Sequence, residues 1–297
     1  MVMVLLYDGS NTSTSELGAT HINNSTRRPK PVLPPKRRSH VEDEAYNDPG
    51  IAEDDPRIVQ ALREKFLFPP SDEPYNLVHN RSHNPSIGQQ QVIDKLLRQM
   101  RGGFYVECGG FDGESYSNSL TLERERGWKG LLVEPDSKNF QRMKEKNRKA
   151  YIAHSCLAET PYPKKVLFQR GYYAGHIMQQ EGLQAALSED IDVEYIQCFP
   201  LYSFMVALNV SKIDYFSLDV EGSEYDVLRN IPWDKVDIST LSVEYHSKAA
   251  TYELILELMK KEGYVMYTKI NHYTLFADDF IFVKKEILDQ YQNDSRD

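Results

Sequence analysis

Short apolar runs alternate with amphipathic stretches of helical length along most of the chain after residue 100. Most of these runs carry no regular polar alternation, as expected for strands that are covered on both faces. The predicted strands are 103–108, 129–134, 150–156, 195–199, 213–222, 239–246, 264–270 and 279–284. The helices predicted between them are 117–126, 136–147, 201–208, 223–231 and 248–262. This order predicts an α/β fold with a mostly parallel sheet, to which a terminal hairpin adds an antiparallel pair at one edge.

Two further helices are predicted ahead of this core. Asp55 is a suitable N-cap, and Pro56 occupies the first helical position that follows it. Ser86 and Gln89 have the spacing of a capping box. We expect both helices to pack on the edge or the mouth of the sheet. The predicted helices are 57–67 and 86–100.

Composition divides the chain into three parts. Residues 1–54 are rich in Ser, Thr, Asn and Pro and predict a disordered tail and linker. Residues 55–285 form the predicted domain, within which 157–194 interrupt the alternation of strand and helix and contain a helix candidate at 178–187. Residues 286–297 are predicted to be a flexible C-terminal tail.

A candidate binding site begins where the first core strand ends. Glu107 lies at that end, and Gly109, Gly110 and Gly113 follow within one turn, where the backbone can bend sharply and approach a ligand. The next helix directs its N-terminal N–H groups to the same point. A carboxylate ahead of the first glycine disfavours a pyrophosphate and favours a ligand with an ammonium group. Asp112 could contact the carboxylate end of that ligand or cap the helix.

Glu134 ends the following strand, about 20 residues after the last glycine, where an acidic side chain suits the hydroxyl groups of a ribose. An ammonium group and a ribose occur together in S-adenosylmethionine, which is therefore the predicted cofactor. Glu107 would hold its ammonium group and Glu134 its ribose. The alternative is a tight strand-to-helix turn in some other α/β protein.

Acidic residues and a histidine also fall at the carboxyl ends of the later strands: Asp219, Glu221, Glu224, Glu244 and His246. Methyl transfer to a hydroxyl group can need a side chain that removes a proton. The candidate catalytic residues are His246, Asp219 and Glu221. The two acids could instead hold a divalent cation or cap backbone groups, and we expect no metal. Glu224 is predicted to cap the start of a helix.

An aromatic cluster lies in the interrupting segment. Tyr172, Tyr173 and His176 could line a pocket for the methyl acceptor. Aromatic packing within the insertion is the alternative, and we favour it slightly.

Bulk properties exclude several functions. The 297 residues are 40% hydrophobic and 27% charged, which allows one sizeable domain with tails or two small domains. A net charge of −9 and a pI of about 5.5 argue against nucleic-acid binding, because that needs a basic face. No apolar run approaches the about 20 residues that span a bilayer.

The cysteines and glycosylation sequons bear on the compartment. Cys108, Cys156 and Cys198 are far apart and lack the spacing of a zinc site, so we expect buried free thiols or one disulfide. The pattern N-x-S/T is more frequent than chance predicts and indicates a chain in the lumen of the secretory pathway or outside the cell. The sequons begin at Asn11, Asn23, Asn24, Asn80, Asn209 and Asn293.

Four segments together resemble the FkbM-type methyltransferase domain: VECGGFDG, LLVEPD, IDYFSLDVEGSEYDVL and LSVEYH. The resemblance covers 86–285 and implies a Rossmann-like, S-adenosylmethionine-dependent methyltransferase fold with seven strands, the last of them antiparallel. It also implies an acidic-glycine motif and a ribose-binding acid, supplied by Glu107, Gly109, Gly113 and Glu134. The family's turn usually reads Gly-Ala-Asn-x-Gly, whereas here the bulky Phe111 stands in place of the small polar residue.

The segment PPSDEPYNL ahead of the domain resembles the corresponding part of arthropod Star proteins. This resemblance implies a membrane-tethered protein of the endoplasmic reticulum, Golgi and endosomes that exports membrane-anchored precursors of epidermal-growth-factor-receptor ligands. Star proteins carry a transmembrane helix upstream, so we expect membrane association only through a segment absent from this chain. Three hypotheses stay open. The one we favour is a Star-like escort, and the alternative is an O-methyltransferase that acts on a glycan or small-molecule hydroxyl. The third is a soluble cytosolic enzyme in which the sequons occur by chance.

Overall fold

Five parallel strands form the centre of the larger sheet, and an antiparallel strand follows them. In spatial order these strands are β4 (Tyr151–His154), β3 (Lys129–Glu134), β2 (Phe104–Cys108), β9 (Lys212–Leu218), β10 (Asp237–Glu244) and β12 (Asp278–Lys284). β11 (Tyr264–Asn271) pairs antiparallel with β12 and forms one edge. This arrangement confirms the predicted α/β methyltransferase fold with its mostly parallel sheet and antiparallel last strand.

The computed structural model describes residues 46–79, 83–171, 174–178, 191–245, 249–271 and 278–293. All of them belong to the compact unit 38–297. The predicted helix at 178–187 lies almost wholly outside the described residues, as does most of the predicted N-terminal tail. No helix in the described ranges combines the length and the apolar character needed to cross a membrane.

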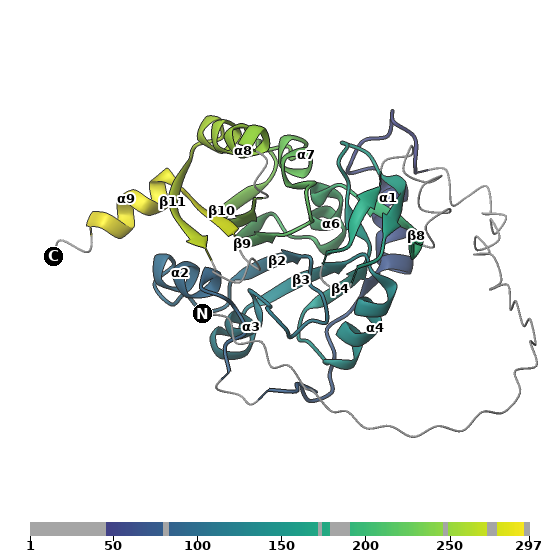
Figure 1. Cartoon of the computed structure of the whole chain (residues 1–297), viewed down its shortest axis with the longest axis horizontal. Helices are drawn as coiled ribbons and strands as arrows, with labels where there is room; N and C mark the ends of the chain where they lie inside the picture. Colours follow the sequence, from purple (N-terminus) through teal and green to yellow (C-terminus); the bar gives the residue numbers. More distant parts are fainter. Residues whose placement is uncertain are drawn as a thin grey trace, which may run out of the picture. The chain divides into compact units, whose positions relative to one another are not determined.

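Helices cover both faces of the larger sheet (Figure 1). The helices on one face are α1 (Pro56–Ala61), the π-helical turn η2 (Leu62–Phe66), α6 (Leu201–Leu208), α7 (Glu224–Arg229) and α8 (Ala249–Lys261). The helices on the other face are α2 (Gln89–Leu96), α3 (Leu120–Arg126), α4 (Ser137–Glu145) and α9 (Lys285–Asn293). Within β2, Tyr105 joins one apolar cluster and Val106 the other, which explains why this strand lacks polar alternation.

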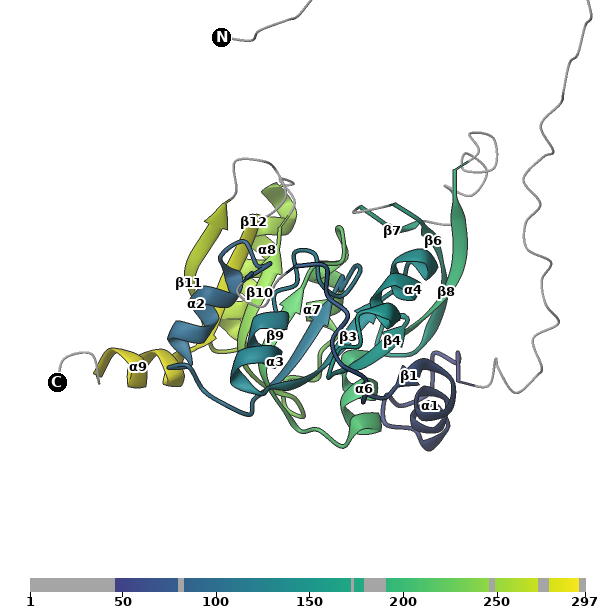
Figure 2. The same cartoon turned by 90° about the horizontal axis from the view of Figure 1, so that it is seen from below.

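A second, four-stranded sheet stands beside α4 (Figure 2), and the sequence pattern did not predict it. Its strands, in spatial order, are β5 (Cys156–Leu157), β8 (Val193–Phe199), β6 (Lys164–Gln169) and β7 (His176–Met178). The run 150–156 was predicted as one strand, but β4 ends at His154 and the chain enters the second sheet after the single residue Ser155. Both strands are apolar, so hydrophobicity alone did not reveal the change of sheet.

The predicted linker up to residue 54 is partly ordered. Tyr46 and Ile51 are buried in the larger apolar cluster, and the ring of Tyr46 lies 5.8 Å from that of Phe199. The side-chain amides of Asn47 and Gln197 donate hydrogen bonds to each other at 3.1 and 2.7 Å. The acidic composition of this stretch predicted a linker, but these contacts with β8 and the apolar cluster hold it against the domain.

The boundaries of the first helices differ from those predicted. Asp55 caps α1 by accepting a hydrogen bond from the Arg57 N–H, as expected, but the helix then widens into the π-helical turn η2 and gives way to a short strand. That strand, β1 (Leu67–Phe68), pairs antiparallel with β4, so the larger sheet has eight strands instead of the seven predicted. α2 begins after Gly88, while Ser86 accepts a hydrogen bond from the Gln90 N–H.

The C-terminal segment is helical rather than a flexible tail over its described part. α9 follows β12 directly, and its Leu288 is only 8% exposed because it packs into the cluster under α2. The apolar residues of this helix are few, and the polar composition around them led to the prediction of a tail.

Candidate functional site

The glycine turn after β2 folds against two neighbouring strands. Gly109 and Gly113 have φ values of +80° and +78°, which a residue with a side chain adopts at a cost. The N–H groups of Gly109 and Gly110 both donate to the carbonyl oxygen of Val133 at 3.2 Å. A Cβ atom at position 109 would lie 2.2 Å from the carbonyl oxygen of Asp219, so only glycine fits between β2 and the end of β9.

Glu134 joins this turn to the end of β3. Its carboxylate accepts hydrogen bonds from the N–H of Phe111 at 2.7 Å and from the N–H of Asp136 at 2.9 Å. Burial raises the pKa of Glu134 to about 8, although these two N–H groups oppose the shift. Phe111 itself has a φ of +47°, an unusual value for a residue with a large side chain.

A pocket of about 660 Å³, its open mouth included, lies beyond the carboxyl ends of β2, β3 and β9. This is where ligands bind in open α/β sheets. The wall nearest the glycine turn contains Gly109, Phe111, Glu134, Asp136 and Asn139. The wall after β9 contains Asp219, Val220, Glu221 and Ser223. The second sheet and its loops supply Cys156, Phe168, Gly171, Gly175 and Ile177.

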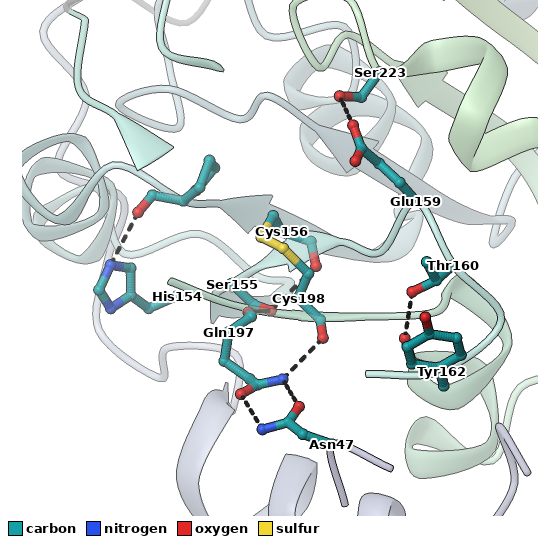
Figure 3. Close-up of a disulfide and its surroundings, with 11 residues drawn as sticks. Asn47, His154, Ser155, Cys156, Glu159, Thr160, Tyr162, Gln197, Cys198 and Ser223 are labelled. Carbon is teal, nitrogen blue, oxygen red and sulfur yellow. Dashed lines mark hydrogen bonds between the residues drawn. A yellow bond between two sulfur atoms is a disulfide. The ribbon is translucent and has the colours of Figure 1, made fainter. Parts of the chain in front are cut away.

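A disulfide links two neighbouring strands of the second sheet, and one of its cysteines, Cys156, lines the pocket. Cys156 in β5 and Cys198 in β8 are directly paired in register, and their sulfur atoms are bonded (Figure 3). Next to them, the Ser155 hydroxyl donates to the carbonyl oxygen of Gln197 at 2.6 Å. The free thiol predicted as one possibility is found only at the buried Cys108.

Glu107 lies outside the lining of this pocket. Its carboxylate accepts hydrogen bonds from the hydroxyl groups of Ser117 and Ser119 and from the N–H of Asn118 at 2.7 Å. The side chain therefore anchors the segment ahead of α3. Asp112 also acts locally, because it accepts from the N–H groups of the two residues that follow Gly113.

Three carboxylates meet after β9 and β10. One oxygen from each of Asp219, Glu221 and Glu244 lies within 4.8 Å of the others. Burial, followed by the charges of Glu244 and Glu221, raises the pKa of Asp219 well above its usual range. Burial, followed by the charge of Glu221, raises the pKa of Glu244 to about 8. Like-charged groups this close favour a state in which a proton is retained between them.

The acidic turn that contains Asp219 is held by Glu224. This buried carboxylate accepts from the N–H of Val220 at 3.0 Å and from the N–H of Gly222 at 3.1 Å. Glu224 therefore caps backbone N–H groups, as predicted, and those groups belong to the turn that precedes its helix. Glu221 between them has a φ of +56°.

One acidic residue of this region, Asp279 of β12, was not selected from the sequence. Glu244 ends β10 and pairs in register with Asp279 of β12. Asp279 accepts a hydrogen bond from Gln89 at 2.8 Å, and burial raises its pKa to about 6. Glu244 was selected by the same rule as Asp219, because it lies where a strand ends, whereas Asp279 lies near the start of its strand.

The other predicted site residues either lie outside the described residues or, in the case of His176, do not line the pocket. His246, Tyr172 and Tyr173 lie outside the described residues. His176 opens β7, and one ring nitrogen lies 3.3 Å from the carbonyl oxygen of Ala174. It is not part of the pocket lining, although the next residue, Ile177, is.

Solved methyltransferase structures are similar to this chain at low identity. A methyltransferase from Pyrococcus furiosus is 14% identical, and the match covers 71% of this chain and 89% of that one with a TM-score of 0.36. The human methyltransferase 10 domain containing protein is 13% identical, with 76% and 92% covered and a TM-score of 0.38. A TehB-like SAM-dependent methyltransferase from Corynebacterium glutamicum is 11% identical, with 69% and 90% covered and a TM-score of 0.36.

Sequence comparison identifies the family. No curated protein matches the chain. The resemblance to Star proteins therefore gains no support and stays a prediction. The profile of the Methyltransferase FkbM domain matches residues 107–266, a segment that begins at Glu107 and contains the glycine turn, Glu134 and the acidic cluster. Because this match spans more than half of the chain, the protein belongs to the FkbM methyltransferase domain family.

Proposed function

We propose that this protein is an S-adenosylmethionine-dependent methyltransferase. The observation that carries the proposal is the position of Glu134, a buried carboxylate in the pocket wall at the end of β3, fixed beside the glycine turn by the N–H of Phe111. An acidic side chain at this place in a nucleoside-binding sheet suits the two hydroxyl groups of a ribose. Gly109 of the glycine turn lines the same pocket.

The residues of the pocket fit this cofactor. Glu134 would hold the ribose, and the backbone of Gly109 would lie along the cofactor. Glu107 would act indirectly, because its oxygens already accept from Ser117, Ser119 and Asn118 and so fix the segment after the turn. The cofactor supplies a methyl group on a sulfonium. The protein holds the acceptor in line and keeps water away.

The acidic cluster supports a hydroxyl acceptor. Asp219 and Glu244 both have raised pKa values, and a carboxyl pair that retains one proton near neutral pH can accept another from a hydroxyl group. With Glu221 beside them, the pocket repels anions. We therefore expect a neutral or cationic acceptor, such as a sugar or another small polyol, rather than a phosphorylated one.

The first test is calorimetric titration of the full chain with S-adenosylmethionine and S-adenosylhomocysteine. We expect micromolar binding, and Glu134→Gln should weaken it by about 1–3 kcal/mol through the lost hydrogen bonds. Glu257→Gln, on the exposed side of α8, is the matched control and should bind as the wild type does. Absence of binding up to millimolar cofactor by a folded sample, or unchanged affinity in the Glu134 variant, would contradict the cofactor assignment.

One observation favours a second candidate function. The carboxylate of Glu107 is fully engaged within the protein and does not line the pocket, which is compatible with a fold kept for its surface. A Star-like escort of membrane-anchored growth-factor precursors in the secretory pathway would be such a protein. In that case a folded Glu107→Ala/Glu134→Ala variant should still export its cargo. Loss of export from such a variant would contradict an escort function that does not need the pocket.

A further inference from the structure

The turn between α6 and β9 carries a complete glycosylation sequon, Asn209–Val210–Ser211. Asn209 and Ser211 are both exposed. Asn209 is the C-cap of α6 with a φ of +56° and a ψ of +45°, a conformation that asparagine tolerates better than most residues. The tripeptide is therefore presented at the tip of a turn rather than within a strand or helix.

The backbone of this turn is held without help from the asparagine side chain. The N–H of Asn209 donates to Val206 at 3.1 Å and the N–H of Val210 donates to Met205 at 2.9 Å. Arg63 donates to the carbonyl oxygen of Ala207 at 2.7 Å and so completes the end of the helix. Within the described ranges no hydrogen bond uses the Asn209 amide, so a substituent on its nitrogen would displace no contact there.

The turn is remote from the pocket. It lies at the amino end of β9, whereas Asp219 and the pocket lie at the carboxyl end. The seven residues of β9 separate the two ends by about 20 Å. A bulky group on Asn209 would therefore leave the pocket mouth open.

A second observation comes from the interior. Cys156 and Cys198 form a buried disulfide between paired strands. Structural disulfides persist in oxidising compartments and are rare in the cytosol. The secretory pathway is also where N-linked glycans are added. The exposed sequon and the buried disulfide do not depend on each other, and both indicate the same compartment.

We propose that Asn209 carries an N-linked glycan and that the protein folds in the lumen of the secretory pathway. In this modification the Asn209 Nδ2 forms a bond to the anomeric carbon of an oligosaccharide donor linked to a lipid diphosphate. The bond from that carbon to the diphosphate oxygen breaks, the lipid diphosphate leaves with the electron pair, and the amide nitrogen loses a proton. The proposal is independent of methyl transfer.

The decisive experiment uses the protein purified from cells that produce it naturally. Enzymatic release of N-glycans in heavy-oxygen water converts each glycosylated asparagine to labelled aspartate, which peptide mass spectrometry detects. We expect the label at Asn209, together with a Cys156–Cys198 disulfide-linked peptide in an unreduced digest. Recovery of the Asn209 peptide only as unmodified asparagine would overturn the proposal.

Variants of the full chain, directed to the secretory pathway by a cleavable signal peptide, separate the sequon from protein folding. Asn209→Gln and Ser211→Ala should each lose one glycan's shift in electrophoretic mobility. Ser211→Thr keeps the sequon and should retain the shift. Equal mobility of all four proteins after secretion would contradict the assignment of Asn209.

Discussion

Gly109 lies directly against the carbonyl oxygen of Asp219, so that a Cβ atom at position 109 would lie 2.2 Å from it. This contact joins the glycine turn after β2 to the acidic turn after β9. The two motifs are about 100 residues apart in the chain, yet they share one boundary of the pocket. The position of the acidic cluster therefore depends on the absence of a side chain at residue 109.

We expect Gly109→Ala to destabilise the protein more than a positive φ alone explains. The left-handed backbone costs about 1–2 kcal/mol for a residue with a Cβ. The overlap with Asp219 adds about 1–3 kcal/mol. Gly127→Ala is the control, because Gly127 has a φ of +68° with no atom within 4 Å of the added Cβ. Urea unfolding followed by circular dichroism compares the two, and equal losses would refute the contact.

Loss of the Cys156–Cys198 disulfide should lower stability strongly. The bond closes a loop with a sequence separation of 42, for which chain entropy predicts about 4 kcal/mol. A Cys156→Ser/Cys198→Ser variant should unfold at lower urea than the wild type. Reductant should shift the wild type and leave the variant unchanged. If both proteins had the same urea midpoint without reductant, the disulfide would contribute nothing to the free energy of unfolding.

Stability should fall as pH rises from about 5 to about 8. Glu134 and Glu244 have folded pKa values of about 8 against 4.5 for the ordinary group. A raised acid stabilises the folded state fully below the unfolded pKa, and that stabilisation is lost as pH rises through the folded pKa. Each such group contributes a slope of up to about 1.4 kcal/mol per pH unit.

Glu244→Gln tests this pH dependence, because it removes one of these groups. The groups facing Glu244 are the acids Asp219, Glu221, Glu224 and Asp279. Since all are acidic, the variant should unfold with a flatter pH profile and gain stability at the alkaline end relative to the wild type. Glu257→Gln should leave the profile unchanged. A Glu244→Gln profile parallel to that of the wild type would contradict the raised pKa.

Arg148 should be essential for stability. Its Nε donates to both oxygens of Glu123 at 3.1 and 3.2 Å, and both side chains are fully buried. The same guanidinium donates to the carbonyl oxygen of Gly113 in the turn. Arg148→Met leaves the Glu123 charge unpaired and should cost about 3–5 kcal/mol in urea unfolding.

An exposed ion pair provides the comparison for Arg148. Arg229 and Asp226 lie 2.8 Å apart on α7 with side chains 52% and 42% exposed. Arg229→Met should cost no more than about 1 kcal/mol. Similar losses for Arg148→Met and Arg229→Met would mean that the buried pair adds no more than a surface pair.

The larger sheet was predictable because its signals are local. The core strands are short and mostly apolar, and the helices between them are bounded by glycine or by capping residues such as Asp136, whose carboxylate caps α4. Glu134 could be placed in the pocket because its position follows from the strand that it ends. The acids after β9 could be selected for the same reason.

The second sheet and the partners of Glu107 were not predictable in this way. Nothing local distinguishes His154 in one sheet from Cys156 in the other, since the change occurs at a single serine. Glu107 was predicted to bind the ammonium group of a ligand because it lies at the end of a strand, just ahead of the glycine turn. Its actual partners, Ser117 and Ser119, depend on how the chain turns before α3. Such contacts between side chains distant in sequence require the folded structure.

All four strands of the second sheet come from one uninterrupted part of the chain, between Cys156 and Phe199. They supply one side of the pocket, while Glu134 and the glycine turn on the opposite side are encoded earlier. This segment can therefore be replaced or lengthened in evolution without changing the part of the fold that contains Glu134. We expect relatives that recognise different acceptors to differ mostly in this segment and little around Glu134.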